Sequence, residues 1–233
     1  MPDYDKTIIC LANSRKPSGR CVAGKEYENG LIGGWVRPVS ARPGQEISEL
    51  DRRYENGSRA QLLDIVSIRL KEHRPKDHQQ ENHLIDDGYY WERVRRADWK
   101  LVQTAVDSHV QDLWTNGDSS YHGVNDRVAE AAVSALDSSL ALIRPESLRV
   151  RVLAEGADFG NNKKIVRAFF DLHGSRYGIR VTDPEIETEF CAQGEGTYKP
   201  GEAILCISLA EDAYRGHCYK LVAAIITPAR SGA

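Results

Sequence analysis

The stretch "ICLANSRKPSGRCVAGKEY", Ile9 to Tyr27, sets a polar run between two apolar runs. The apolar runs are typical of strands, and Pro-Ser-Gly at residues 17–19 is typical of the turn that joins two strands. The sequence therefore predicts a pair of neighbouring strands here. The turn needs no more than these three residues, so the two cations and two small polar side chains at residues 13–16 are left for another role.

Further apolar runs in the first third of the chain, "GGWVRPVS" and "QLLDIVSIRL", have the same character. Each is bounded by Gly, Pro, Asn or Ser, which favours a small antiparallel sheet over helices. In the second run Val66, Ile68 and Leu70 alternate with the residues at 65, 67 and 69. This period of two predicts a strand with one buried face.

The middle of the chain has a helical pattern. Apolar residues recur every three or four positions: Trp99, Val102, Val106, Val110 and Leu113. The pattern predicts a dominant helix from Asp98 to Trp114, with Asp98 as its N-cap. Residues 115–127 are loop by composition, and "LALI" further on predicts a strand.

After Pro145 the strand pattern resumes. "LRVRVLAEG" alternates apolar residues with Arg149 and Arg151, "KKIVRAFFDLHGSRYGIRVTD" predicts a hairpin that turns at His173–Ser175, and "VTDPEIE" predicts a strand followed by a turn. Two more strands are expected in "AILCISLAE" and "CYKLVAAIITP". The last is almost entirely apolar, so we expect it to be a central or barrel-closing strand.

These patterns indicate a mainly β fold with a helical insert (α+β). The expected domains are an N-terminal barrel at residues 1–96, a helical connector at 97–137 and a C-terminal barrel at 138–233. An antiparallel unit of this size fits a partly open Greek-key barrel, and the OB-fold is a leading candidate. SH3-like barrels and small sandwiches fit the strand count as well.

Charge is distributed unevenly along the 233 residues. Residues 1–42 contain 7 Lys and Arg against 4 Asp and Glu, residues 43–137 contain 12 against 18, and residues 138–233 contain 12 against 12. A broad basic face for duplex DNA is not indicated by this balance. A small anionic ligand, or a few nucleotides in one groove, needs far less positive charge.

The five cysteines are spaced too widely for a zinc-ribbon pair or a compact disulfide framework. The N-terminal "MPDYDKTIICLA" does not resemble a signal peptide, and no apolar run reaches the length of a membrane helix. We therefore expect a cytoplasmic protein with no membrane partner.

Several stretches together resemble a bacterial family named for its dual OB-containing domain. They are "CLANSRKPSGRCVAG", "GGWVRPVS", "QLLDIVSI", "HQQENHLI", "GVNDRV", "RVTDPEIE" and "GHCYKLVAAIIT". The resemblance runs from about Thr7 to Thr227. It implies two tandem small OB-like β-barrels and a role in nucleic-acid or nucleotide recognition, often suggested for bacterial defence systems. It implies no reaction and no catalytic residue.

The ligand-binding candidates come mainly from the first expected barrel. They are Asn13, Ser14, Arg15, Lys16, Arg20, Trp35, Arg37, Gln80, Glu81, Asn82 and Arg127. In this hypothesis the cations at the strand ends neutralise phosphate, Trp35 stacks a base, and the amides and Ser14 read polar edges. Trp35 and Arg37 share parity and so point to one face of their strand. A core tryptophan beside a solvated arginine is the competing interpretation.

Two other clusters contain side chains of the types used in metal binding or catalysis. His78, Glu81 and His83 lack the spacing of a metal site, so a polar loop is favoured and no metal or other cofactor is expected. Ser120, His122 and Asp126 are too close in sequence for a hydrolase triad, so a loop held by its own side chains is favoured.

We therefore interpret the chain as a recognition module for a nucleotide or single-stranded nucleic acid. One alternative is an enzyme that acts on these molecules, with Glu81 or Asp126 as general base and Arg15 or Arg127 stabilising charge. The other alternative is an adaptor that binds a protein partner through the acidic middle segment.

Overall fold

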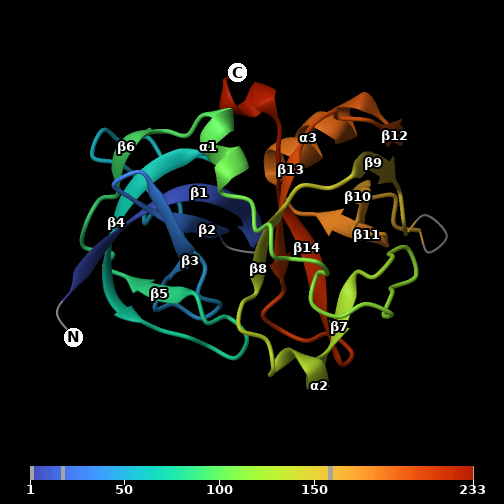
Figure 1. Cartoon of the computed structure of the whole chain (residues 1–233), viewed down its shortest axis with the longest axis horizontal. Helices are drawn as coiled ribbons and strands as arrows, with labels where there is room; N and C mark the ends of the chain where they lie inside the picture. The colour runs from blue at the N-terminus through green and yellow to red at the C-terminus, as the bar shows by residue number, and fades with distance from the viewer. Residues whose placement is uncertain (1–2, 17–18, 157–159, 233) are drawn as a thin grey trace. The chain divides into compact units, whose positions relative to one another are not determined.

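The computed structural model describes residues 3–16, 19–156 and 160–232, so the predicted turn residues Pro17 and Ser18 lie outside the described part. Strands dominate the structure, which confirms the mainly β fold class. The chain divides into two compact units (Figure 1). The first runs to Ala105 and also includes the end of the chain from Ser231, and the second runs from Val106 to Arg230. Among the described residues no helix is both long and apolar enough to cross a membrane.

The first unit is a closed barrel. Its strands are β1 (Tyr4–Lys16), β2 (Gly19–Glu28), β3 (Leu31–Val39), β4 (Asp64–His73), β5 (Asn82–Ile85) and β6 (Glu92–Arg96). They follow the order β1-β2-β3-β5-β4, and β1 also pairs with β4, so five strands form a ring to which β6 is added. β3 and β5 run parallel, and the other neighbours run antiparallel. This is the Greek-key order of an OB barrel.

The core of the first barrel follows the predicted alternation. Val66, Ile68 and Leu70 of β4 lie in this core, as expected. β1 and β2 cross so closely that a Cβ added to Gly24 would lie 2.1 Å from the backbone oxygen of Ile9. A residue without a side chain is therefore required at this point of the barrel wall.

The second unit has more elements. They are β7 (Arg127–Ala129), α2 (Glu130–Val133), β8 (Leu140–Ile143), β9 (Ser147–Leu153), β10 (Ile165–Leu172), β11 (Ser175–Val181), α3 (Pro184–Gln193), β12 (Gly196–Tyr198), β13 (Ile204–Leu209), β14 (His217–Ile226) and the 3-10 helix η2 (Pro228–Ser231). The sheet has the order β12-β9-β10-β11-β14-β13-β8, and β7 pairs with β14.

The second unit repeats the connections of the first. β9, β10, β11, β14 and β13 reproduce the order of β1, β2, β3, β5 and β4, including a parallel pair, β11 with β14. Among the described residues β9 pairs with β10 and β12, and no pairing joins β9 to β13. The second barrel is therefore an OB-type barrel without the pairing that closes the first. β14 is central, as its apolar sequence predicts.

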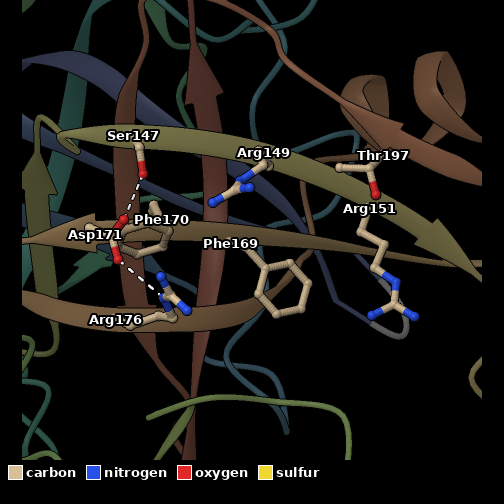
Figure 2. A pocket seen from close by; sticks show the side chains of 8 residues that line it. All are labelled: Ser147, Arg149, Arg151, Phe169, Phe170, Asp171, Arg176 and Thr197. Atoms are coloured by element: carbon tan, nitrogen blue, oxygen red, sulfur yellow. Dashed lines mark hydrogen bonds and ion pairs between the residues drawn. The ribbon is translucent and has the colours of Figure 1, made fainter.

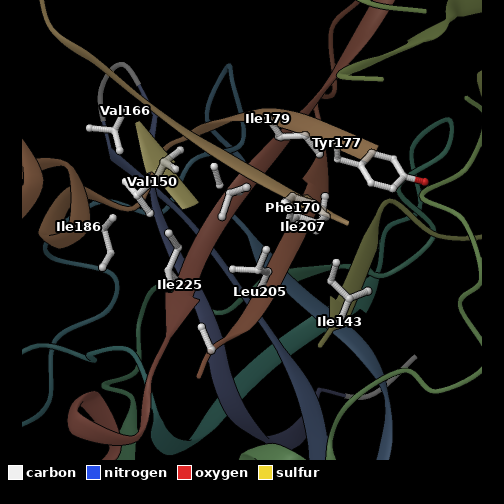
Figure 3. Packing of buried hydrophobic residues seen from close by; sticks show 14 of the residues in the cluster. Ile143, Val150, Val166, Phe170, Tyr177, Ile179, Ile186, Leu205, Ile207 and Ile225 are labelled. Atoms are coloured by element: carbon white, nitrogen blue, oxygen red, sulfur yellow. The ribbon is translucent and has the colours of Figure 1, made fainter. Parts of the chain in front are cut away.

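Apolar side chains from the inner face of this sheet form the second core (Figure 3). Val150, Val166, Ile179 and Ile225 belong to it. The ring of Phe170 stacks on that of Tyr177 with 5.3 Å between centroids.

The expected helix at 98–114 is shorter than predicted. α1 spans only Trp99–Thr104, although Asp98 caps it as predicted by accepting a hydrogen bond from the Leu101 backbone at 2.8 Å. Beyond it, Asp107 exchanges two hydrogen bonds of 2.8 Å with the backbone of Leu142. This long-range pairing is incompatible with a helix that continues past residue 107. The segment 97–137 therefore contains only α1 and α2 as helices.

A second correction concerns "VTDPEIE". Asp183 begins helix α3, where a turn was predicted, and its carboxylate accepts from the backbone of Glu185 and Ile186. Proline in the first turn and Ile186 and Phe190 four residues apart are ordinary helix signals, and both apolar side chains are buried. The hairpin between β10 and β11 turns at His173 as predicted.

Candidate functional site

The first four candidate residues are the last four of β1. Arg15 pairs with Arg20 across the hairpin, and Lys16 Nζ donates to the Gly44 backbone oxygen at 2.8 Å. Ser14 is buried, and the amide of Asn13 reaches the Ala60 backbone oxygen at 3.4 Å. The structure therefore gathers these cations at one end of the β1–β2 pair, as the sequence predicts.

The candidates on β3 and β5 lie in the barrel wall. Trp35 and Arg37 share the outer face of β3, since Val36 between them lies in the core. Arg37 pairs with Glu81 at 3.1 Å, and both side chains are 4% exposed. Asn82 is fully buried. Sequence parity placed Trp35 and Arg37 correctly on one face but did not reveal that Arg37 is enclosed.

Trp35 and Gln80 are more accessible than this ion pair. Trp35 is half-buried, and the ammonium group of Lys25 lies 5.5 Å from the centroid of its ring. Gln80 is exposed. The last candidate, Arg127 on β7, belongs to the second unit, whereas the other ten belong to the first.

His83, from the cluster of His78, Glu81 and His83, is held by neighbouring rings. It shares a hydrogen bond of 2.7 Å with the Tyr4 hydroxyl, and its ring centroid lies 4.8 Å from that of His73. Burial, followed by the charges of His73 and Lys6, lowers the pKa of His83 to about 4. In the described part of the chain no three His, Cys, Asp or Glu side chains are grouped as metal ligands.

The loop that precedes β7 is held by its own side chains, as predicted. Ser120 donates to Asp126 through both its backbone, at 2.7 Å, and its hydroxyl, at 2.5 Å. Arg167 approaches the same carboxylate at 3.3 Å, and Asp126 is 2% exposed. Both oxygens of the Asp126 carboxylate therefore bind neighbouring groups that hold the loop in place.

A pocket of about 290 Å³ lies on the outer face of the second barrel (Figure 2). Its lining residues are Ser147, Arg149, Arg151, Phe169, Phe170, Asp171, Arg176 and Thr197. None of them was among the sequence candidates. They come from β9, β10, β11 and β12.

Strand register explains why these side chains meet. Phe169 of β10 pairs with Arg149 on one side and with Gly178 on the other. Asp171 pairs with Ser147 and Arg176 in the same way. Cross-strand partners share a face, so these rows stand on the side opposite to the core.

Gly178 makes room for the aromatic ring. A Cβ at this position would lie 2.7 Å from a ring carbon of Phe169 and 3.1 Å from the Val124 nitrogen. Val124 also exchanges backbone hydrogen bonds with Gly178, at 2.8 and 3.2 Å. The glycine therefore lets the ring lie beside β11, and in the view of Figure 2 the ring is flanked by Arg149 and Arg151.

The pocket carries three arginines against one carboxylate. Asp171 accepts from the Ser147 hydroxyl at 2.8 Å and from Arg176 at 3.3 Å, and these contacts hold its pKa below the usual value. Arg149 and Arg151 are exposed. A guanidinium group binds phosphate, and an accessible aromatic ring stacks a base. The arrangement is therefore suited to a nucleotide.

Two features of the sequence could have located this pocket. Arg149 and Arg151 alternate with core residues in "LRVRVL", which puts both on the outer face. The predicted turn at His173 also sets Phe169 opposite residue 178. Combining the two would have shown an aromatic residue beside exposed arginines.

Comparison with known proteins identifies a family. The model of the family described as Dual OB-containing domain matches residues 6–225, which takes in both barrels. No functionally curated protein matches the chain, and no solved structure matches it.

Proposed function

The chain belongs to the dual OB-containing domain family, and on that premise we propose that it recognises a nucleotide or a short single-stranded nucleic acid. OB folds commonly bind such ligands across their second and third strands. In the second barrel these strands are β10 and β11. They carry Phe169 and Arg176 on the outer face, where the pocket lies.

The observation that carries the proposal is the position of Phe169 among arginines. Its ring is the partner of Arg149 across the sheet, and Arg151 and Arg176 line the same pocket. Stacking of a base on such a ring contributes about 1–3 kcal/mol and tolerates any sequence. The arginines would neutralise the phosphates that flank the stacked base.

The size of the pocket sets the scale of the ligand. A volume of about 290 Å³ is near the lower limit of small-ligand sites. One nucleotide unit of a strand fits this scale better than a large folded ligand. Further nucleotides would follow the exposed arginines of β9.

Recognition is favoured over catalysis because both candidate bases are enclosed. Glu81 is tied to Arg37, and Asp126 is tied to Arg167 and Ser120. A general base must reach the proton that it removes. A role in bacterial defence, which the sequence resemblance implies, stays a prediction.

Fluorescence anisotropy with a labelled oligo-dT of about 12 nucleotides tests the proposal, since one OB fold covers about 4–16 nucleotides. Phe169→Ala should weaken binding by about 1–3 kcal/mol, and Phe169→Trp should retain it. The double variant Arg149→Ala/Arg151→Ala should also lower the salt dependence by about one to two released ions.

Arg144→Ala provides the control, because Arg144 forms an exposed ion pair with Glu202 and does not line the pocket. It removes one positive charge outside the pocket and should bind as the parent does. A Phe169→Ala variant that binds as tightly as the parent contradicts the proposal. A parent chain that binds neither nucleotides nor oligonucleotides but retains a protein partner would favour the adaptor alternative.

A further inference from the structure

Three arginines of the first barrel converge on one carboxylate. Arg52 donates to both oxygens of Glu49, at 2.7 Å each. Arg59 Nε lies 2.9 Å and Arg20 Nε 3.6 Å from the same carboxylate. Arg20 comes from β2, and the other residues come from the connection between β3 and β4.

Contacts other than Glu49 place two of these arginines. Arg20 exchanges backbone hydrogen bonds of 2.8 and 2.9 Å with Ile47, which is fully buried in the core. Gly19 allows this approach, since a Cβ there would lie 2.6 Å from the Ile47 oxygen. Arg52 donates to the Ala60 backbone oxygen at 2.6 Å and is itself buried. Arg20 and Arg52 therefore do not depend on Glu49 for their positions.

The cluster has more positive charge than Glu49 can balance, and solvent reaches it. The Glu49 side chain is 45% exposed and that of Arg59 is 51% exposed. Partial burial acts to raise the pKa of Glu49, but the hydrogen bonds from Arg52 and the charges of the three arginines lower it overall. An ionised carboxylate thus lies at an open site with surplus cations.

Another carboxylate of the same connection shows what fastening the chain requires. The Asp51 carboxylate pairs with Arg42 and accepts from the Ser48 backbone, while the Asp51 backbone donates to the Ser48 hydroxyl. One arginine suffices there. The three around Glu49 exceed the needs of one carboxylate but match a group with more oxygens and more charge.

We propose that Arg20, Arg52 and Arg59 form a binding site for a terminal phosphate or pyrophosphate, which Glu49 occupies when no ligand is bound. Guanidinium groups bind carboxylates and phosphates with the same two-pronged geometry, so the Glu49 carboxylate stands where the phosphate oxygens bind. A phosphomonoester or pyrophosphate offers more oxygens and charge than a carboxylate. The site is on the other barrel from Phe169 and does not depend on the function proposed there.

Calorimetric titration of the full chain with inorganic pyrophosphate, at matched ionic strength, tests this site. Glu49→Gln removes the internal competitor and should bind about tenfold tighter than the parent, the change expected for one charge-assisted interaction. Adding Arg59→Ala should remove about the same factor. Glu26→Gln, which breaks an ion pair with Lys6 elsewhere on the barrel, is the control and should match the parent.

Equal pyrophosphate affinity in the parent and Glu49→Gln would overturn the proposal, as would a double variant that binds like Glu49→Gln. Thermal melting gives a second readout if Glu49→Gln does not fold. Pyrophosphate should raise the melting temperature of the parent more than that of Arg59→Ala, and equal shifts would contradict the site.

Two labelled oligonucleotides distinguish the sources of the phosphate. If Glu49→Gln prefers a 5′-phosphorylated strand over a 5′-hydroxyl strand and the added Arg59→Ala abolishes the preference, the group is a strand end. If there is no preference but the pyrophosphate response persists, the group belongs to a free nucleotide or pyrophosphate.

Discussion

The two barrels share a strand order but differ on the face of their second and third strands. In the first barrel Lys25 and Trp35 are partners there, and Lys25 is 7% exposed and donates to the Ala105 backbone oxygen at 2.7 Å. In the second barrel the partners are Phe169 and Gly178, beside the exposed Arg149. With the same strand order, this face is used for packing in the first barrel and is open in the second. The side chains, and not the topology, therefore decide what each face can bind.

The connection from the third to the fourth strand differs as well. In the second barrel it contains α3, whose Ile186 and Phe190 are buried. In the first barrel residues 40–63 form no helix and carry Glu49 with two of its three arginines, Arg52 and Arg59. An irregular connection can turn several arginines toward one point, whereas a packed helix uses one face for the core.

The largest expected effect is on stability, when a buried ion pair is broken instead of a more exposed one. Glu81→Gln removes the negative charge that faces the buried Arg37 and should cost about 3–5 kcal/mol of unfolding free energy. Glu26→Gln on the same barrel breaks a more exposed pair and should cost less than about 1 kcal/mol. Urea denaturation measures both, and equal losses would contradict the structural role of Arg37.

A smaller effect is expected at the third strands. Gly178→Ala introduces a methyl group 2.7 Å from the Phe169 ring and should cost about 1–3 kcal/mol of stability. Gly34→Ala on β3 meets no atom within 4 Å and should change stability by about 0.5 kcal/mol or less. The two variants together compare the space beside β11 with the space beside β3. A Gly178→Ala variant as stable as the parent would contradict the close contact between residue 178 and the Phe169 ring.

The next effect depends on pH and concerns the first barrel. The pKa of His83 is lowered to about 4, so the folded state favours the neutral ring while the unfolded chain takes up a proton near pH 6.5. Stability from this group is present above about pH 6.5 and is lost as the pH falls toward 4. Denaturation at several pH values should show a shallower loss in His83→Gln than in the parent.

The smallest effect is expected at the strand ends of the first barrel. Arg15→Ala/Lys16→Ala removes two cations outside the Phe169 pocket, so binding of a 5′-hydroxyl oligonucleotide should change by about 0.5 kcal/mol or less. The same anisotropy assay compares this variant with Arg149→Ala/Arg151→Ala. A larger loss at Arg15 and Lys16 would assign the main binding face to the first barrel.

Local patterns predicted much of the fold. Alternation and turn residues located most strands, including β4 with Val66, Ile68 and Leu70 in the core. The helix length was wrong because Asp107 pairs with Leu142, a contact that the sequence around residue 107 does not reveal. Helix α3 was missed although Asp183 and Pro184 are ordinary signals for a helix start.

The candidate site was harder to predict than the strands. Parity placed Arg37 on an outer face, but its burial with Glu81 depends on the parallel pairing of β3 with β5. The arginines around Glu49 meet because an irregular connection folds back on β2, and no periodic pattern describes such a path. Phe169 could have been predicted, because its strand and the following turn were. This required combining the pairing of its strand with β9, which carries Arg149, and with β11, which carries Gly178.

The most direct test of the open face is a titration of the isotope-labelled chain with unlabelled oligo-dT, followed by amide chemical shifts. We expect the largest changes at residues of β9, β10 and β11, including Arg149, Phe169 and Gly178, and small changes on β2 and β3. Changes concentrated on β2 and β3, around Lys25 and Trp35, would contradict the assignment of the binding face to the second barrel.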